Sequence, residues 1–341
     1  MIKTFAGFFL GLTIALSLTL LAGENPFHIA GILFNSAFGS VYDLGLTLFY
    51  TTPLIFCGLS VAIAFHAGLF NIGAEGQLTI ATLTAAAVGV LLPEVPFPLA
   101  PLLALVAALI AGALWGLIAG WLRAYRGSHE VIVTIMLNFI AAGVASWFAL
   151  HVIPNPNSQN PESALVGPGY MLKSHDWFAQ MFPDTPVSMA LLVAIAVAVA
   201  VWILLWKTTF GYELRAVGYN AEAASRAGIS DKKMKMAAMA LAGAFAGFVA
   251  LGEVMGSYGQ FKMGFSADYG FIGIAVALLA QNNPLGIVFA AFLMGALHKG
   301  ASDLDLETTT ITRDFSKIIQ SLIILGVASH GLWTWRRRKK S

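Results

Sequence analysis

The sequence predicts an all-α membrane protein, a bundle of transmembrane helices, and three observations carry this prediction. Of the 341 residues, 58% are hydrophobic and only 11% are charged, whereas soluble globular proteins carry about 25% charged residues. The apolar residues form long continuous runs, which favours helices over the alternating strands of a membrane barrel. The basic residues cluster in a few of the connections between these runs. The whole chain, 1–341, is therefore expected to form a single transmembrane domain.

About ten apolar segments are candidates for membrane crossings, because a helix needs roughly 20 residues to span the hydrocarbon core. The first lacks a clear cleavage site, so it is expected to be a retained span and not a signal peptide. The eighth and ninth are short, and each is either a thin span or half of a re-entrant pair. The ten segments are 5–22, 44–65, 72–91, 98–122, 131–150, 189–206, 236–256, 270–281, 285–300 and 317–334.

The distribution of Lys and Arg sets the expected orientation. If ten segments cross, 14 of the 19 basic residues fall on one side, and the positive-inside rule assigns that side to the cytoplasm. Both termini and the loop 207–235 are then cytoplasmic, and the loop 151–188 is extracytoplasmic. Ten segments also divide into five plus five, which gives two halves of opposite orientation, as in an inverted-topology repeat. In that division the glycine-rich breaks 66–77 and 257–270 correspond.

The first break places polar side chains between two apolar segments separated by very few loop residues. Its polar members are Asn71, Glu75 and Gln77. Charged groups are costly at the bilayer centre, and non-helical backbone is tolerated there only where protein or water covers it. Two interpretations stay open: a broken helix that lines a solute path, or an ordinary cytoplasmic turn with a solvated Glu75.

The cytoplasmic loop 207–235 contains the signals of a short helix. Asn220 is a good N-cap and Gly228 a good helix stop, with about two turns between them. A small capped helix parallel to the membrane suits docking into the groove of a partner. The alternative is a loop whose basic residues only set the topology.

The outer connection 259–270 combines aromatic, amide and acidic side chains, in Gln260, Phe261, Phe265 and Asp268. Such a set suits a sugar or a base ring, which has an apolar face and polar edges. Aromatic residues are also common at membrane interfaces without any ligand. Glu253, just before this connection, is either an intramembrane polar site or an end residue that reaches the interface.

Several classes of function are excluded. Cys57 is the only cysteine and the seven histidines are scattered, so neither a disulfide framework nor a clustered metal site is expected. The phosphate-binding pattern G-x-x-x-x-G-K-S/T does not occur, and no catalytic constellation stands out. We therefore expect a protein that is not itself an enzyme, has no catalytic residues and binds no cofactor. The net charge of +2 does not suggest nucleic-acid binding.

Three runs, in order along the chain, resemble one family. They are Gly68–Gln77, Gly211–Asn220 followed by Ala227-Gly228-Ile229, and Asn282–Gly286 followed by Phe292–Leu297. They are similar to the ABC-importer permeases of the branched-chain amino acid/ribose permease superfamily, and closest to its nucleoside/simple-sugar branch. The usual Asn-Pro of the coupling segment is here Asn220-Ala221. Proline at this position only preorganises the first helical turn, so alanine should be tolerated.

The resemblance implies the pore subunit of an ATP-driven importer of nucleosides or simple sugars in the bacterial cytoplasmic membrane. ATP and Mg would be bound by a separate cytoplasmic ATPase subunit. An extracytoplasmic substrate-binding lipoprotein would deliver the solute, and a second, homologous permease, expected as a heterodimer partner, would complete the path. The alternative is an ion-coupled secondary transporter, which would need paired intramembrane acids, and the sequence offers few.

The site residues follow from the motifs and the resemblance together. The solute path is expected near Phe70, Asn71, Glu75, Gln77, Gln260, Phe261, Phe265 and Asp268. Coupling to the ATPase is expected at Glu213, Arg215, Gly218, Asn220, Ala223, Ala224 and Gly228.

Overall fold

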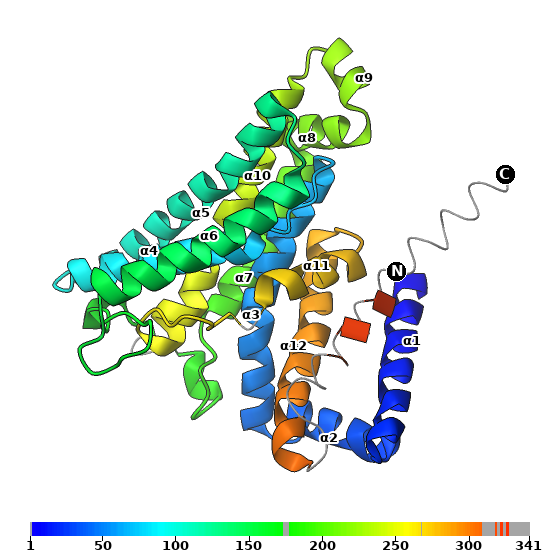
Figure 1. The fold of residues 1–341 in the computed structure, drawn as a ribbon, viewed down its shortest axis with the longest axis vertical. Coiled ribbons are helices and arrows are strands. Elements are labelled where there is room, and N and C mark those ends of the chain that lie inside the picture. The colour runs from blue at the N-terminus through cyan, green and yellow to red at the C-terminus, as the bar shows by residue number, and fades with distance from the viewer. Residues whose placement is uncertain are drawn as a thin grey trace.

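The structure is a computed structural model that describes residues 2–172, 177–266 and 268–308 and positions 318, 321, 322, 325 and 326. The described part is a bundle of helices (Figure 1), as the sequence predicts. Seven of its helices are long and apolar enough to cross a membrane. They are α3 (Val41–His66), α4 (Ala74–Leu91), α5 (Leu99–Arg126), α6 (Glu130–His151), α7 (Ala190–Lys207), α10 (Asp231–Gly247) with its continuation η5 (Leu251–Tyr258), and α12 (Pro284–Glu307).

The remaining helices are shorter. They are α1 (Ile2–Leu18) with η1 (Thr19–Ala22), α2 (Pro26–Phe38), α8 (Thr209–Tyr219), α9 (Ala221–Arg226), α11 (Tyr269–Leu279) and the turns η2 (Pro168–Tyr170) and η4 (Ala179–Met181). The expected first segment coincides with α1 and η1, whereas most of the expected last segment, 317–334, lies outside the described residues. Helix α2 was not predicted. The side chain of Asn25 caps it by accepting a hydrogen bond from Phe27 N, and Pro26 opens it.

Helix α3 forms the centre of the bundle. Its most apolar stretch is 83% buried, compared with 28% in α5 and 22% in α6. It packs against α7, α10, α11 and α12. The outward apolar faces of α5 and α6 are those of helices that face lipid, because a water-facing helix would be polar on that side.

Helices α5 and α10 approach each other closely through their backbones. A Cβ built on Gly243 would lie 1.9 Å from the carbonyl oxygen of Gly112, and one built on Gly116 would lie 2.2 Å from that of Met239. Small residues at these crossings let two membrane helices approach without side chains between them. These glycines therefore set the distance between the two helices.

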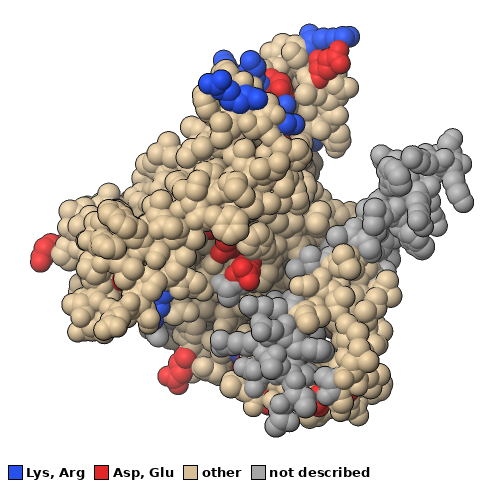
Figure 2. Space-filling model, viewed as in Figure 1, with Lys and Arg blue, Asp and Glu red and all other residues tan. Residues whose placement is uncertain are grey.

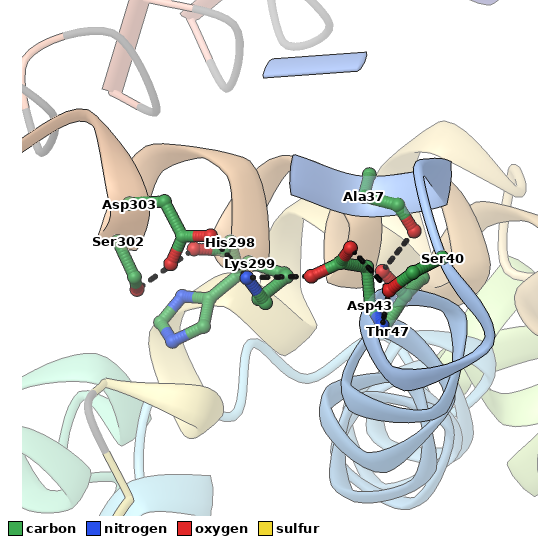
Figure 3. A network of polar contacts seen from close by, with 8 residues as sticks. All are labelled: Ala37, Ser40, Asp43, Thr47, His298, Lys299, Ser302 and Asp303. Atoms are coloured by element: carbon green, nitrogen blue, oxygen red, sulfur yellow. Dashed lines mark hydrogen bonds and ion pairs between the residues drawn. The ribbon is translucent and has the colours of Figure 1, made fainter. Parts of the chain in front are cut away.

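Helix α12 is longer than predicted. The sequence suggested a short segment ending at residue 300, but α12 continues to Glu307, so the prediction of two short segments is wrong for this one. The reason is an ion-pair cluster (Figure 3): Lys299 Nζ lies 3.5 Å from Asp43 Oδ1 at the start of α3 and also pairs with Asp303. Asp43 and Asp303 neutralise the charge of Lys299, the residue whose polarity led to the prediction that the helix ends near residue 300.

Helix α11 is the short segment that the sequence did predict. Its 11 residues rise about 16 Å at 1.5 Å per residue, roughly half the thickness of the hydrocarbon core. It therefore enters the bundle without spanning a membrane alone. Figure 1 shows it beside α3 and α12, and it packs on both.

The charges are distributed unevenly over the surface. Figure 2 shows Lys and Arg atoms gathered at the end of the molecule that carries α8 and α9 in Figure 1, while the long apolar flanks carry few charges. On this face most of the visible Lys and Arg atoms thus lie at one end of the bundle, in line with the charge pattern of the sequence.

Candidate functional site

Two helix N-termini meet inside the bundle, and Glu75 lies between them. Glu75, in the first turn of α4, accepts a hydrogen bond from Gly270 N of α11 at Oε2 (2.8 Å) and one from the Ser266 hydroxyl at Oε1. A Cβ on Gly270 would lie 2.4 Å from Glu75 N, so the two backbones touch. The partial positive charge at each N-terminus favours an anionic or electron-rich group at this junction.

A cavity of about 300 Å³ opens beside this junction. The rings of Phe261 and Phe265, 5.8 Å apart and steeply inclined, supply an apolar wall, and Glu75, Ser266 and Asp268 supply hydrogen-bonding groups. Figure 2 shows acidic atoms in a recess of this face of the molecule. The full lining is Glu75, Thr79, Asn138, Ala142, Phe261, Met263, Gly264, Phe265, Ser266 and Asp268. Such a lining suits a small molecule with an aromatic or sugar face and polar edges.

The break between α3 and α4 is held by buried amide side chains. Asn71 Oδ1 accepts from Gly73 N (3.0 Å), and the amides of Asn71 and Gln77 exchange two hydrogen bonds (2.9 and 3.2 Å). From α6, Asn138 accepts from Gly76 N (2.8 Å) and donates to the carbonyl of Ile72 (3.0 Å). These bonds satisfy backbone groups that a helix break leaves without partners. The break is therefore buried in protein.

The expected path residues separate into two sets. Glu75, Phe261, Phe265 and Asp268 line the cavity together. The other four lie outside its lining and have partners of their own.

Asn71 and Gln77 lie behind the cavity wall, in the break. Gln260 Nε2 donates to Glu162 Oε2 (3.3 Å), and the ring of Phe70 packs 5.2 Å from that of Phe65. Six of the lining residues were not singled out from the sequence, and three of these six have polar side chains: Thr79, Asn138 and Ser266. Only Asn138 carried a signal, as a lone amide in the apolar run 131–150.

The long loop between α6 and α7 is attached to one side of this site. Ser163 N donates to the carbonyl of Phe261 (2.9 Å), and Phe261 N donates to the Ser163 hydroxyl (2.9 Å). Phe261 forms part of the cavity wall, so a movement of the loop would displace that wall.

The loop 207–235 is more ordered than predicted, with two helices, α8 and α9. The Asn220 side chain caps α9 as expected, accepting from Glu222 N (3.1 Å) and Ala223 N (3.0 Å), and Gly228 follows the helix with φ +86°. Ala224 is buried and Ala223 exposed. Helix α8, which contains Glu213, Arg215 and Gly218, was not predicted as a helix.

Helix α8 rests on the turn that begins the α3–α4 break. A Cβ on Gly218 would lie 2.1 Å from the carbonyl oxygen of His66, so the two backbones are in contact. His66 Nε2 lies 3.0 Å from the carbonyl oxygen of Asn282, in the turn between α11 and α12. The guanidinium of Arg215 stacks 5.5 Å from the ring of Trp206, at the end of α7. Helix α8 is thus connected through His66 to the α3–α4 break and to the turn between α11 and α12.

The family described as branched-chain amino acid transport system, permease component, matches residues 44–328. The chain belongs to this permease family. The matched range includes the α3–α4 break, the cavity and the α8–α9 segment of the permease. It extends from the start of α3 to beyond α12.

Three relatives of the permease carry names that state a solute. It is 38% identical over 322 residues, 94% of its own chain and 90% of the relative, to the guanosine ABC transporter permease protein NupP of Bacillus subtilis (strain 168). It is 35% identical over 330 residues (94% and 88%) to the nucleoside ABC transporter permease protein NupB of Lactococcus lactis subsp. cremoris (strain MG1363). It is also 35% identical over 307 residues (88% and 80%) to the glucose ABC transporter permease protein TsgB13 of Haloferax volcanii.

Proposed function

We propose that this permease is the membrane-spanning subunit of an ATP-binding cassette importer that carries nucleosides. The observation that carries the proposal is the 38% identity to a guanosine permease over 94% of the chain. The cavity supports it, because a nucleoside combines an aromatic base with a hydroxylated sugar. The paired phenylalanine rings of the cavity suit the aromatic base, and its acidic and hydroxyl groups suit the sugar.

Transport would proceed by alternating access, driven from the α8–α9 end. Closure of a partner ATPase would push on α8, which contacts the His66 turn through Gly218. The same turn is bonded to Asn282, so the push would reach α4 and α11 together. Their N-termini form the cavity wall, and their movement would open it to the other side. ATP and Mg would be held by the partner, because this chain has no phosphate-binding loop.

Two relatives in one organism support a heterodimer of permeases. In Bacillus subtilis, both NupP and NupQ are named guanosine ABC transporter permease proteins, and they match this chain at 38% and 28% identity. In Lactococcus lactis, NupB and NupC match at 35% and 26%. This chain would take the place of NupP or NupB beside a partner resembling NupQ or NupC. A substrate-binding protein would dock at the loop 151–188, and the α8–α9 end would face the cytoplasm.

Charge reversal in α8 tests the proposal. With the complete importer in proteoliposomes, Glu213→Lys together with Arg215→Glu should abolish ATP-driven nucleoside uptake while membrane insertion and solute binding by the delivery protein persist. Glu94→Lys, in the exposed connection between α4 and α5, is the matched control and should transport normally. Normal uptake by the α8 variant would reject the coupling assignment. Uptake driven by an ion gradient without the ATPase would reject the importer in favour of a secondary transporter.

A further inference from the structure

A second carboxylate, Glu253, lies deep in the bundle and is not used by the site described above. It is 1% exposed, and neither of its oxygens has a hydrogen-bond partner among the described residues. This burial excludes an end residue that reaches the interface. Glu253 lies in η5, a π-helical stretch of eight residues that continues α10. Such π-helical stretches occur often at functional sites. An ionisable side chain inside a membrane domain is itself an indication of a functional site, because its burial is costly.

Glu75 and Glu253 differ in one decisive respect. Glu75 has both oxygens occupied, by Ser266 and Gly270. Neither oxygen of Glu253 has a partner among the described residues, although buried polar groups nearly always find partners. Lys299, the lysine of α12, is paired with Asp43 and Asp303. Within the described part of the chain, the two oxygens of Glu253 are therefore open to a ligand that donates hydrogen bonds.

Two tyrosines lie beside this carboxylate and belong to a cluster of aromatic side chains from four elements. Tyr258 of η5 and Tyr269 of α11 lie close enough to Glu253 for their hydroxyls to interact with it. The ring of His298 lies 4.8 Å from that of Tyr50 in α3 and 6.0 Å from that of Tyr269. Its imidazole points away from the Lys299 ion pairs (Figure 3), and its buried Nδ1 has no hydrogen-bond partner within the described part of the chain.

The cluster also adjoins the cavity. Asp268, which precedes Tyr269, lines the cavity, and Gly270, which follows it, bonds Glu75. Tyr269 itself reaches His298 on the other side. The start of α11 thus separates the cavity from Glu253, and a shift of α11 would join the two.

We propose that Glu253, with the adjoining cluster of tyrosine and histidine rings, forms a second, membrane-embedded subsite that recognises the base of a purine nucleoside carrying two adjacent N–H donors. Guanosine is such a nucleoside. A carboxylate accepts both hydrogen bonds from the guanine N1–H and 2-amino groups in a bidentate, charge-assisted pair. The aromatic rings would stack on the base, as in pockets that bind an isolated nucleobase. The inference rests on the proposed nucleoside transport and names which nucleoside the chain prefers.

The exchange Glu253→Gln tests this subsite. A glutamine amide offers one acceptor and one donor, which matches adenine but places its NH₂ group against a donor of guanine. In proteoliposomes with the complete importer, the ratio of guanosine to adenosine uptake below saturation should fall at least about tenfold, the value of one hydrogen bond to a charged group. Glu253→Asp should slow guanosine uptake without improving adenosine uptake. The exposed control Glu94→Gln should leave the ratio unchanged.

The possible outcomes distinguish a failure of the Glu253 subsite from a failure of the proposed nucleoside transport. An unchanged ratio in a Glu253→Gln variant that still transports would overturn the subsite, and so would an equal loss for both nucleosides. If the wild-type importer carries neither nucleoside, the proposed function fails and not merely this site. If the variant does not accumulate in membranes, the proposal is tested by measuring the binding of guanosine and inosine to the wild-type importer without the delivery protein. Guanosine should then bind at least about tenfold more tightly than inosine, which lacks the 2-amino group, and equal affinities would overturn the proposal.

Discussion

At the scale of single residues, the cavity depends on Glu75, whose carboxylate joins two helices that are 195 positions apart at this contact. The sequence could indicate that a glutamate in a glycine-rich break matters. It could not indicate that Ser266 and Gly270 would be its partners, because that pairing exists only after α11 has folded back against α4. The same holds for Asn138, which stabilises the α3–α4 break only because the folded chain brings it to Gly76 and Ile72.

Removing the Glu75 carboxylate should separate the two N-termini. Glu75→Ala loses both hydrogen bonds, and bonds to a charged group contribute about 1.5–3 kcal/mol each. Glu75→Gln keeps an acceptor and should lose less. We expect ATP-driven uptake to fall in the order wild type, glutamine, alanine, together with the midpoint of thermal unfolding in detergent. Wild-type uptake by the alanine variant would contradict a role of this junction in transport.

Asn138 should stabilise the break in proportion to the bonds it makes. Asn138→Leu leaves the Gly76 N–H and the Ile72 carbonyl without partners, at about 1–3 kcal/mol for each buried group. Asn138→Asp keeps the acceptor for Gly76 but turns a second acceptor oxygen toward the Ile72 carbonyl, so it should also be destabilised. Asn157, in the outer loop, is exposed, so Asn157→Leu is the control. Equal thermal stability of Asn138→Leu and Asn157→Leu would exclude this role of Asn138.

At the scale of elements, the long apolar helices follow from composition, and the exceptions have physical causes. Runs such as 44–65 and 131–150 coincide with α3 and α6 to within a few residues, because lipid leaves the backbone no alternative to a helix. The end of α12 was misjudged, since the polarity of Lys299 is cancelled by Asp43, which lies far away in the sequence. Helix α2 was missed because its 13 residues are too few for a span.

The contact between α5 and α10 offers a test at this scale. Gly243→Val would place side-chain atoms where the Gly112 carbonyl lies, and overpacking of this kind costs about 1–3 kcal/mol or more. Gly143→Val, in α6, meets open space and serves as a matched control in a membrane helix. We expect a lower unfolding midpoint in detergent for the first and no change for the second. Similar midpoints would show that the two helices can separate freely.

At the scale of the whole molecule, the working mechanism requires that α8 and the outer loop face opposite sides of the membrane. Most of the Lys and Arg atoms visible in Figure 2 lie at the α8–α9 end, and an excess of Lys and Arg marks the cytoplasmic side. The cavity lies between that end and the loop tied to Phe261. A push on α8 at one face of the membrane could then open the cavity to the opposite face. If α8 instead lay on the extracytoplasmic face, no cytoplasmic ATPase could reach it.

Cysteine labelling tests this orientation directly, because the only native cysteine, Cys57, is fully buried and should not react. Leu165 in the outer loop is 69% exposed and Tyr219 at the end of α8 is 88% exposed. In intact spheroplasts, a membrane-impermeant maleimide should label the Leu165→Cys variant and spare Tyr219→Cys, which should react only after the membrane is opened. The unmodified chain should stay unlabelled throughout. If Tyr219→Cys were labelled from outside, α8 would lie on the extracytoplasmic face, and a drive by ATP hydrolysis in the cytoplasm would be physically impossible.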